Sequence, residues 1–175
     1  MKKDIGVHER LYPNPVVLVS SSYENQDNII TLAWTGTVCS NPPLISISIR
    51  PSRHSHGLIK NSGEFVINIP NQHQADLCNY CGTVSGKDTD KFKQLDLTKA
   101  SLDKVKARMI EDCPINIGCR VRDIISLGTH DLFIAEVLQV LVDQDWVYTD
   151  GDLDYDKLST LSWCMGKYYR NVALR

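Results

Sequence analysis

Short hydrophobic runs recur along the chain and predict a protein built mainly of β-strands. Alternation with a period of two indicates a half-buried strand, and residues 44–49 show it most clearly. The other runs that predict strands are residues 15–22, 29–38, 64–69, 120–127 and 132–142. Turn-forming residues at 25–28 and 41–43 separate the first three of these strands.

Two further stretches have less obvious patterns. From Val105 to Ile117, almost every second residue is hydrophobic, so we interpret this stretch as a strand despite its lysine, alanine and arginine residues. Residues 58–61 predict a short helix that begins at Ser52 or Ser55, and residues 72–80 predict a second helix. After residues 146–148 we expect a mostly irregular tail.

The fold class follows from the number and spacing of these elements. Many short strands with few helices favour a mainly β fold, a closed or nearly closed antiparallel β-barrel with short helices inserted. Strands and helices do not alternate strictly, which argues against a doubly wound parallel sheet. No repeat, low-complexity tract or linker divides the sequence, so we expect residues 1–175 to form a single domain.

The composition of the chain limits which partners it is expected to bind and in which compartment it is expected to work. The chain has 175 residues and a formal charge of −2, which argues against a general nucleic-acid-binding protein. The first residues lack the apolar stretch of a secretory signal, and no run approaches the ~18 apolar residues of a membrane span. With only six cysteines, we expect a cytoplasmic protein with free thiols that makes no membrane contact.

The segment from Arg50 to Lys60 is the strongest candidate for a binding site. It places arginines, histidines, a lysine and serine hydroxyls at the point where a strand ends and a helix begins. Backbone N–H groups and the helix dipole attract anions at such a point, so we expect a phosphate-bearing ligand. The alternative is a basic turn that contacts only solvent.

Other candidate groups have equally plain structural alternatives. Asn28, Thr31, Trp34 and Thr35 lie along one strand and either contact a flat heteroaromatic ring or form cross-strand pairs. The 82–86 loop, followed by Lys91, either closes over a ligand or is a solvated face. His130 is either a polar ligand contact or a solvent-facing turn residue.

The chain lacks the motifs of side-chain catalysis and of a metal site, which favours chemistry carried by a cofactor. Cys78 and Cys81 have the spacing of a zinc or dithiol motif, but no second pair accompanies them, so buried thiols are the default interpretation. The chain contains no Ser-His-Asp spacing, nucleophile elbow, P-loop or Rossmann glycine pattern. We therefore expect no catalytic side chain and no metal site.

Taken together, these segments resemble the flavin reductase-like proteins, the family of flavoredoxins and related ferric reductases. The resemblance rests on Asn28-Ile-Ile-Thr31 with Ala33-Trp34, on Asn41-Pro-Pro43, on Arg50-Pro-Ser-Arg-His-Ser-His56, on Ser85-Gly86 to Lys91-Phe92, on His130 before Glu136-Val137, and on the Trp163 segment. It runs from about residue 8 to 171. The chain departs from the family pattern in having Ser55 for a common threonine, Lys87 for an arginine, and a large ring at Trp163.

The resemblance implies an FMN-binding split barrel with Greek-key antiparallel topology that binds FMN noncovalently as a homodimer. By position, it implies that Asn28, Thr31, Ala33, Trp34 and Thr35 line the flavin and its ribityl chain. Arg50, Ser55 and His56 would lie at the phosphate, and Lys91, His130 and Trp163 would complete the pocket.

The implied activity is an oxidoreductase that passes electrons from NAD(P)H through FMN to flavin, ferric iron or another acceptor. Three alternatives stay open: an electron-transfer protein reduced by a protein partner, a flavin-binding module without turnover, and a cysteine-dependent zinc protein. The sequence distinguishes neither NADH from NADPH nor one acceptor from another, because it shows no motif that reads the nucleotide ribose.

Overall fold

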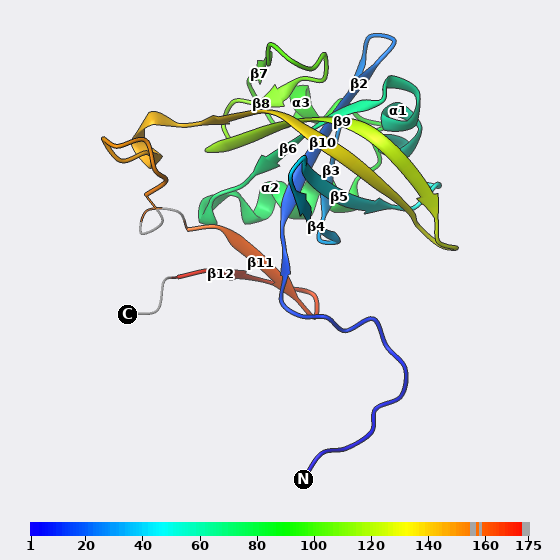
Figure 1. The fold of residues 1–175 in the computed structure, drawn as a ribbon. Coiled ribbons are helices and arrows are strands. Elements are labelled where there is room, and N and C mark those ends of the chain that lie inside the picture. The colour runs from blue at the N-terminus through cyan, green and yellow to red at the C-terminus, as the bar shows by residue number, and fades with distance from the viewer. Residues whose placement is uncertain (155–156, 158, 173–175) are drawn as a thin grey trace.

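Seven strands form one antiparallel sheet whose two edges are joined by the chain itself (Figure 1). The computed structural model describes residues 1–154, 157 and 159–172. In spatial order the strands are β3 (Gln26–Leu32), β2 (Val17–Tyr23), β6 (Glu64–Ile69), β9 (Ile115–Ser126), β10 (Asp131–Val142), β5 (Pro43–Ile49) and β4 (Thr35–Ser40). Only Ala33 and Trp34 separate the edge strands β3 and β4, and this short link curls the sheet into a barrel.

The connections confirm the predicted fold class, a mainly β antiparallel barrel with short helices. Strands β6, β9, β10 and β5 lie side by side in that order, which is a Greek-key arrangement. The longest ladder joins β9 to β10, and it contains two irregularities that let this hairpin bend around the barrel.

Alternating side chains of the strands fill the barrel interior. Its fully buried members include Ile47, Phe65 and Phe133, and helix α1 (His54–Ser62) adds Ile59 to them. Since alternate residues of a strand face opposite sides, the outer faces of β2 and β3 need a separate cover. Helices α2 (Ala75–Thr83) and α3 (Lys91–Gln94) supply it through a second cluster of buried residues.

The last part of the chain folds back on the first strand, which the sequence did not predict. Strands β11 (Leu161–Cys164) and β12 (Lys167–Arg170) form a hairpin that pairs with β1 (Asn14–Pro15). Met165 and Gly166 both have positive φ, as a two-residue hairpin turn requires. The expectation of a mostly irregular tail is therefore wrong for these residues, while residues 155–156, 158 and 173–175 lie outside the described part.

The segment from Val105 to Ile117 is not one strand, contrary to the sequence prediction. It contains only the two-residue β8 (Met109–Ile110), which pairs with β7 (Lys99–Ala100), and the first residues of β9. The remainder is irregular, although its Val105 is buried as the alternation suggested. The predicted strand at 120–127 belongs to the long β9.

Smaller differences concern the ends of the elements. The predicted strand at 29–38 is broken at Ala33 and Trp34, and the first helix starts at His54 with Arg53 as its N-cap rather than a serine. The predicted 72–80 helix begins as a 3₁₀ turn (Gln72–Gln74) before α2, and a second such turn spans Gln144–Trp146.

Two further features concern the first residues of the chain and the length of its helices. Residues 1–11 are exposed and run away from the barrel (Figure 1). Within the residues that the structure describes, no helix combines the length and the apolar character needed to cross a membrane.

Candidate functional site

Three adjoining cavities form a trough along β3. The wide cavity, of about 360 Å³, lies at the Trp34 end, and the polar cavity, of about 290 Å³, lies at the Asn28 end. A junction of about 120 Å³ shares lining residues with each of them. Gly82 of α2 lines all three, so the trough can accept one elongated ligand that reaches from end to end.

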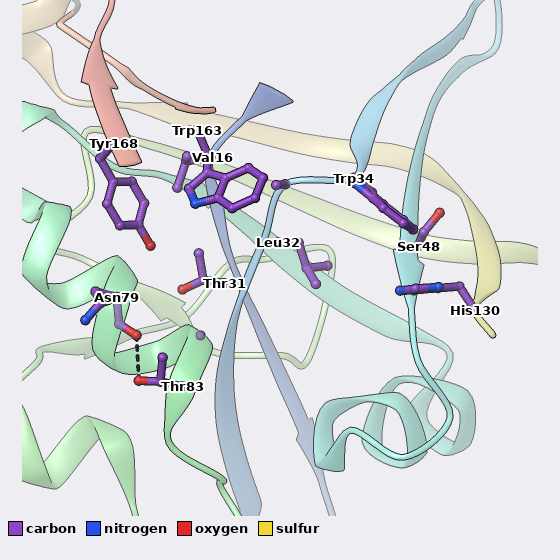
Figure 2. Close-up of a pocket in the computed structure, with 12 residues that line it drawn as sticks. Val16, Thr31, Leu32, Trp34, Ser48, Asn79, Thr83, His130, Trp163 and Tyr168 are labelled. Atoms are coloured by element: carbon purple, nitrogen blue, oxygen red, sulfur yellow. Dashed lines mark hydrogen bonds between the residues drawn. The ribbon is translucent and has the colours of Figure 1, made fainter. Parts of the chain in front are cut away.

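Aromatic and aliphatic side chains dominate the wide cavity (Figure 2). It is lined by Val16, Thr31, Leu32, Ala33, Trp34, Ser48, Asn79, Gly82, Thr83, His130, Trp163 and Tyr168. The break between β3 and β4 places Trp34 at its edge, and hairpin β11–β12 contributes Trp163 and Tyr168 from the opposite end of the chain. Flat apolar walls with a few polar groups are typical of a site for a heteroaromatic ring.

One wall of the wide cavity is a pair of rings in contact. The centroids of Trp34 and His130 lie 4.6 Å apart, with their planes tilted by 43°. Trp34 is 40% exposed, so part of its indole is free to contact a ligand. Burial and the positive charge of Arg50 lower the pKa of His130 below its ordinary value, which favours a neutral imidazole at pH 7.

The polar cavity has the features of an anion site. Its lining includes the start of α1, the 84–87 loop and the positively charged side chains of Arg53, Lys87 and Lys91. The first turn of α1 contains no acidic residue, and no side chain caps its N-terminus. Uncapped N–H groups at a helix start attract an anion, and the hydroxyls of Ser52 and Ser55 add further donors.

Asn28 provides an independent indication that a ligand belongs in the polar cavity. Its Nδ2 donates to Ser55 Oγ at 2.8 Å, but its buried Oδ1 has no hydrogen-bond partner among the described residues. A Cβ on Gly86 would lie 2.0 Å from that oxygen, so only glycine fits at this position of the loop. A buried amide oxygen without a donor is costly, and a hydroxyl group of a ligand would satisfy it.

Lys91 supports the floor of the polar cavity instead of reaching in from a loop. Its ammonium is buried and donates to the carbonyl oxygens of Ile29 at 2.6 Å and Cys81 at 2.8 Å. Burial lowers its pKa from the ordinary value. It thereby joins α2 to β3, and because Lys91 also lines the cavity, an anion bound there would stabilise its charge.

The trough brings together most of the side chains singled out from the sequence. The wide cavity contains Thr31, Ala33, Trp34, His130 and Trp163; the polar cavity contains Asn28, Ser55 and Lys91; the junction contains Arg50. The Thr31 hydroxyl donates to the Cys78 carbonyl at 2.6 Å, so only its lone pairs remain for a ligand.

Two of the expected site residues lie elsewhere. Thr35 lines none of the three cavities, and its hydroxyl donates to the Ser46 carbonyl within the β4–β5 ladder at 2.9 Å. His56 also lines none of them, because its ring turns away and its Nε2 lies 2.8 Å from Asp131 Oδ2. A helical residue one position after Ser55 points about 100° away from it, which separates the two side chains.

Several lining residues were not among the candidates. Arg53 belongs to the recognised cationic segment, but strand and helix patterns do not tell which of its arginines faces a cavity. Asn79, Thr83 and Tyr168 depend on how α2 and the last hairpin pack, which no local pattern reveals. Ser85 belongs to the 82–86 loop, which either closes over a ligand or is a solvated face in the sequence analysis, and Lys87 follows that loop.

Cys78 and Cys81 are buried thiols, as the default interpretation predicted, whereas Cys39 and Cys164 are only half-buried. Cys78, Cys81 and Cys113 lie in one apolar cluster, and burial raises the pKa of Cys81 to about 11 and that of Cys78 to about 12. In the described part of the chain, no three His, Cys, Asp or Glu side chains converge closely enough to hold a metal ion.

A comparison with protein families finds one matching model. The model described as flavin reductase like domain matches residues 9–170, nearly the whole chain. An uncharacterised protein of Archaeoglobus fulgidus is 32% identical over 165 residues, which cover 94% of this chain and 92% of that protein.

Two solved structures with the same fold are flavoredoxins. Flavoredoxin of Desulfovibrio vulgaris (Miyazaki F) is 31% identical, with a TM-score of 0.94, and the match covers 100% of this chain and 96% of the other. Flavoredoxin from Methanosarcina acetivorans is 25% identical, with a TM-score of 0.91 and coverage of 99% and 94%.

Proposed function

The chain belongs to the flavin reductase like domain family, and from this premise we propose that it binds FMN noncovalently in the trough and works as an oxidoreductase. In this proposal, NAD(P)H donates electrons, which pass through FMN to a free flavin, ferric iron or another acceptor. One observation carries the proposal: a cationic, uncapped helix start with an unpartnered Asn28 oxygen is continuous with an aromatic cavity. A ring joined to a phosphate by a polyol chain matches that order of groups.

The residues of the polar cavity fit a phosphate and its attached polyol. Arg53 and Lys87 would neutralise the phosphate, and the first N–H groups of α1 would donate to its oxygens. A ribityl hydroxyl would donate to Asn28 Oδ1, which otherwise stays buried and unpaired. Lys91 would gain an anion near its buried ammonium.

The residues of the wide cavity fit the flavin ring. Leu32, Trp34 and Trp163 offer apolar surfaces against which a flat ring packs, and the nearly neutral His130 offers a hydrogen bond without a fixed charge. When bound, FMN supplies the hydride and electron transfer itself, so no side chain needs to act as an acid or base. The protein holds the ring, excludes water from one side of it and leaves an opening for the donor.

The same proposal covers assembly and location. We propose that residues 1–175 form one domain that acts as a homodimer, as the family resemblance implies, because β4 at the sheet edge is exposed or half-buried along its whole length. Six free thiols fit a reducing cytoplasm.

The proposal is tested by colour and by reduction. Purified protein loaded with FMN and freed of excess is expected to be yellow and to bleach within seconds when NADH or NADPH is added without oxygen. Stopped-flow absorbance near 450 nm measures the rate for each donor. Protein that retains no flavin would contradict the proposal altogether.

A second candidate is an electron carrier that receives its electrons from a protein partner. The similarity to flavoredoxin of Desulfovibrio vulgaris favours it. Such a carrier would bind FMN equally well, but neither nicotinamide would bleach it appreciably faster than free FMN. The same stopped-flow experiment therefore separates the two functions, because chemical reduction by dithionite provides the control for an intact flavin.

Replacing Trp34 with alanine tests the ring end of the trough. We expect a shifted flavin absorbance band, stronger flavin fluorescence and an FMN affinity about 10-fold weaker, since a stacked aromatic contact contributes roughly 0.5–1.5 kcal/mol beyond its buried area. Trp146, outside the trough, gives the matched control Trp146→Ala. An unaltered flavin spectrum in Trp34→Ala would show that this ring does not contact the flavin.

A further inference from the structure

His56 and Asp131 form a buried polar pair outside the trough. His56 Nε2 lies 2.8 Å from Asp131 Oδ2, and Ser126 Oγ donates to Asp131 Oδ1, also at 2.8 Å. The His56 ring packs edge-on against Phe133, with centroids 5.2 Å apart. Both members of the pair are buried, and neither lines any of the three cavities.

Each member of the pair is the sequence neighbour of a trough residue. His56 follows Ser55 in the first turn of α1, the turn that lines the polar cavity. Asp131 follows His130, whose ring contacts Trp34 in the wide cavity. Because consecutive Cα atoms are held about 3.8 Å apart, a displacement of either member moves its neighbour.

The His56–Asp131 pair also connects α1 to the start of β10, two elements that pack mainly on different neighbours. Elsewhere α1 packs chiefly on β2, β3 and β6, none of which pairs with β10. Asp131 pairs along the backbone with Ile49 at the end of β5 and with Ser126 at the end of β9, and its carboxylate accepts a hydrogen bond from Ser126 Oγ. The His56–Asp131 contact joins this strand cluster to the helix.

We propose that His56 and Asp131 are positioning residues, which hold the cationic start of α1 and the His130–Trp34 wall at the separation that one FMN molecule spans. The inference rests on the proposed function. A ligand with a phosphate at one end and a ring at the other gains fully from both ends only when their binding groups are already spaced correctly. A directional buried pair fixes that spacing better than an apolar contact, which tolerates sliding.

The consequence is specific: loss of the pair weakens the coupling between the two ends of the ligand. The measured quantity is the ratio of the dissociation constant of riboflavin, which lacks the phosphate, to that of FMN. In His56→Leu we expect this ratio to fall by about 10-fold, since the advantage of two linked binding groups is lost when they are wrongly spaced. The visible circular dichroism of bound FMN should change as well, because His130 shifts against the ring.

Two variants separate positioning from simple destabilisation. His56→Gln keeps a side-chain N–H that can donate to Asp131, and we expect it to recover most of the wild-type ratio. Asn116→Leu breaks a different buried network, in which Asn116 Nδ2 donates to Asn68 Oδ1 at 2.8 Å, outside the trough. It should lower the melting temperature while leaving the ratio at the wild-type value. If His56→Leu does not fold, Asp131→Asn, which keeps the side-chain shape but removes the charge, replaces it.

The possible results separate the positioning role of His56 and Asp131 from the proposed binding of FMN. Wild-type protein that binds no flavin would overturn both. Wild-type protein that binds FMN, with the same ratio in His56→Leu as in Asn116→Leu, would overturn the positioning role alone. A ratio that falls in His56→Leu and returns in His56→Gln supports it.

Discussion

Replacing Gly82 with leucine is expected to abolish FMN binding while the barrel stays folded. Gly82 lines the wide cavity, the polar cavity and the junction between them. An added Cβ would lie 3.4 Å from Thr31 Cβ, an ordinary van der Waals contact, so the first carbon fits. The rest of a leucine side chain fills the junction, whose volume is only about 120 Å³.

The expected loss is large because the two ends of the ligand would no longer be connected through the trough. We expect FMN affinity to fall by more than ~100-fold, or about 2.7 kcal/mol, in a fluorescence titration. Gly82→Ala should cost far less affinity, and its thermal midpoint should not fall, because alanine is a better helix former than glycine.

Gly57 offers the matched control for this substitution. It is an exposed glycine within α1, and an added Cβ there would meet nothing within 4 Å. Gly57→Leu should therefore bind FMN like the wild type. FMN binding by Gly82→Leu at wild-type strength would contradict a ligand that passes through the junction.

The pattern of hydrophobic side chains predicted most strands of the barrel. It gave a wrong strand where side chains, rather than a neighbouring strand, accept the hydrogen bonds of the backbone N–H groups. In residues 101–108 the N–H groups of Asp103, Lys106 and Arg108 bind Gln139 Oε1, Glu64 Oε2 and Ser22 Oγ. Side-chain oxygens of the barrel thus accept hydrogen bonds from backbone N–H groups that would otherwise need a neighbouring strand. The alternation was genuine burial of Val105 and Ala107, but it did not require a strand.

The last hairpin was missed for a different reason. Its turn residues, Met165 and Gly166, are not the Asn-Gly or Asp-Gly pair that marks a two-residue turn in a sequence. Its pairing partner, β1, is about 150 residues away in the chain, so no local pattern reports it. Consequently Tyr168, which the hairpin brings into the wide cavity, could not be identified.

The sequence allowed us to predict which segments form the candidate site, but not every side chain that lines it. The cation-rich segment, the polar strand and the loop were recognisable by residue type, and the barrel brings them together. Which side chain faces inward depends on the direction of α1, and this direction turns His56 toward Asp131. For the same reason Arg53 lines the polar cavity, whereas Arg50 lines only the junction.

Arg53→Ala is accordingly expected to weaken FMN binding strongly and riboflavin binding hardly at all. Arg53 lines both the polar cavity and the junction, whereas Arg50 lines only the junction. Arg53 is exposed and belongs to none of the ion pairs in the described part of the chain, so its loss should not destabilise the fold. A hydrogen bond to a charged phosphate contributes about 1.5–3 kcal/mol, which predicts a loss of about 10- to 150-fold for FMN.

Arg50→Ala is the matched comparison, because it removes the same charge three residues earlier in the same segment. We expect it to cost FMN less affinity than Arg53→Ala, by fluorescence titration of FMN and riboflavin with each variant. Ser55→Ala is a poorer probe, since it leaves the buried Asn28 Nδ2 without its acceptor and so destabilises the protein itself. If Arg53→Ala weakens riboflavin as much as FMN, or if Arg50→Ala has the larger effect on FMN alone, the phosphate does not bind at the start of α1.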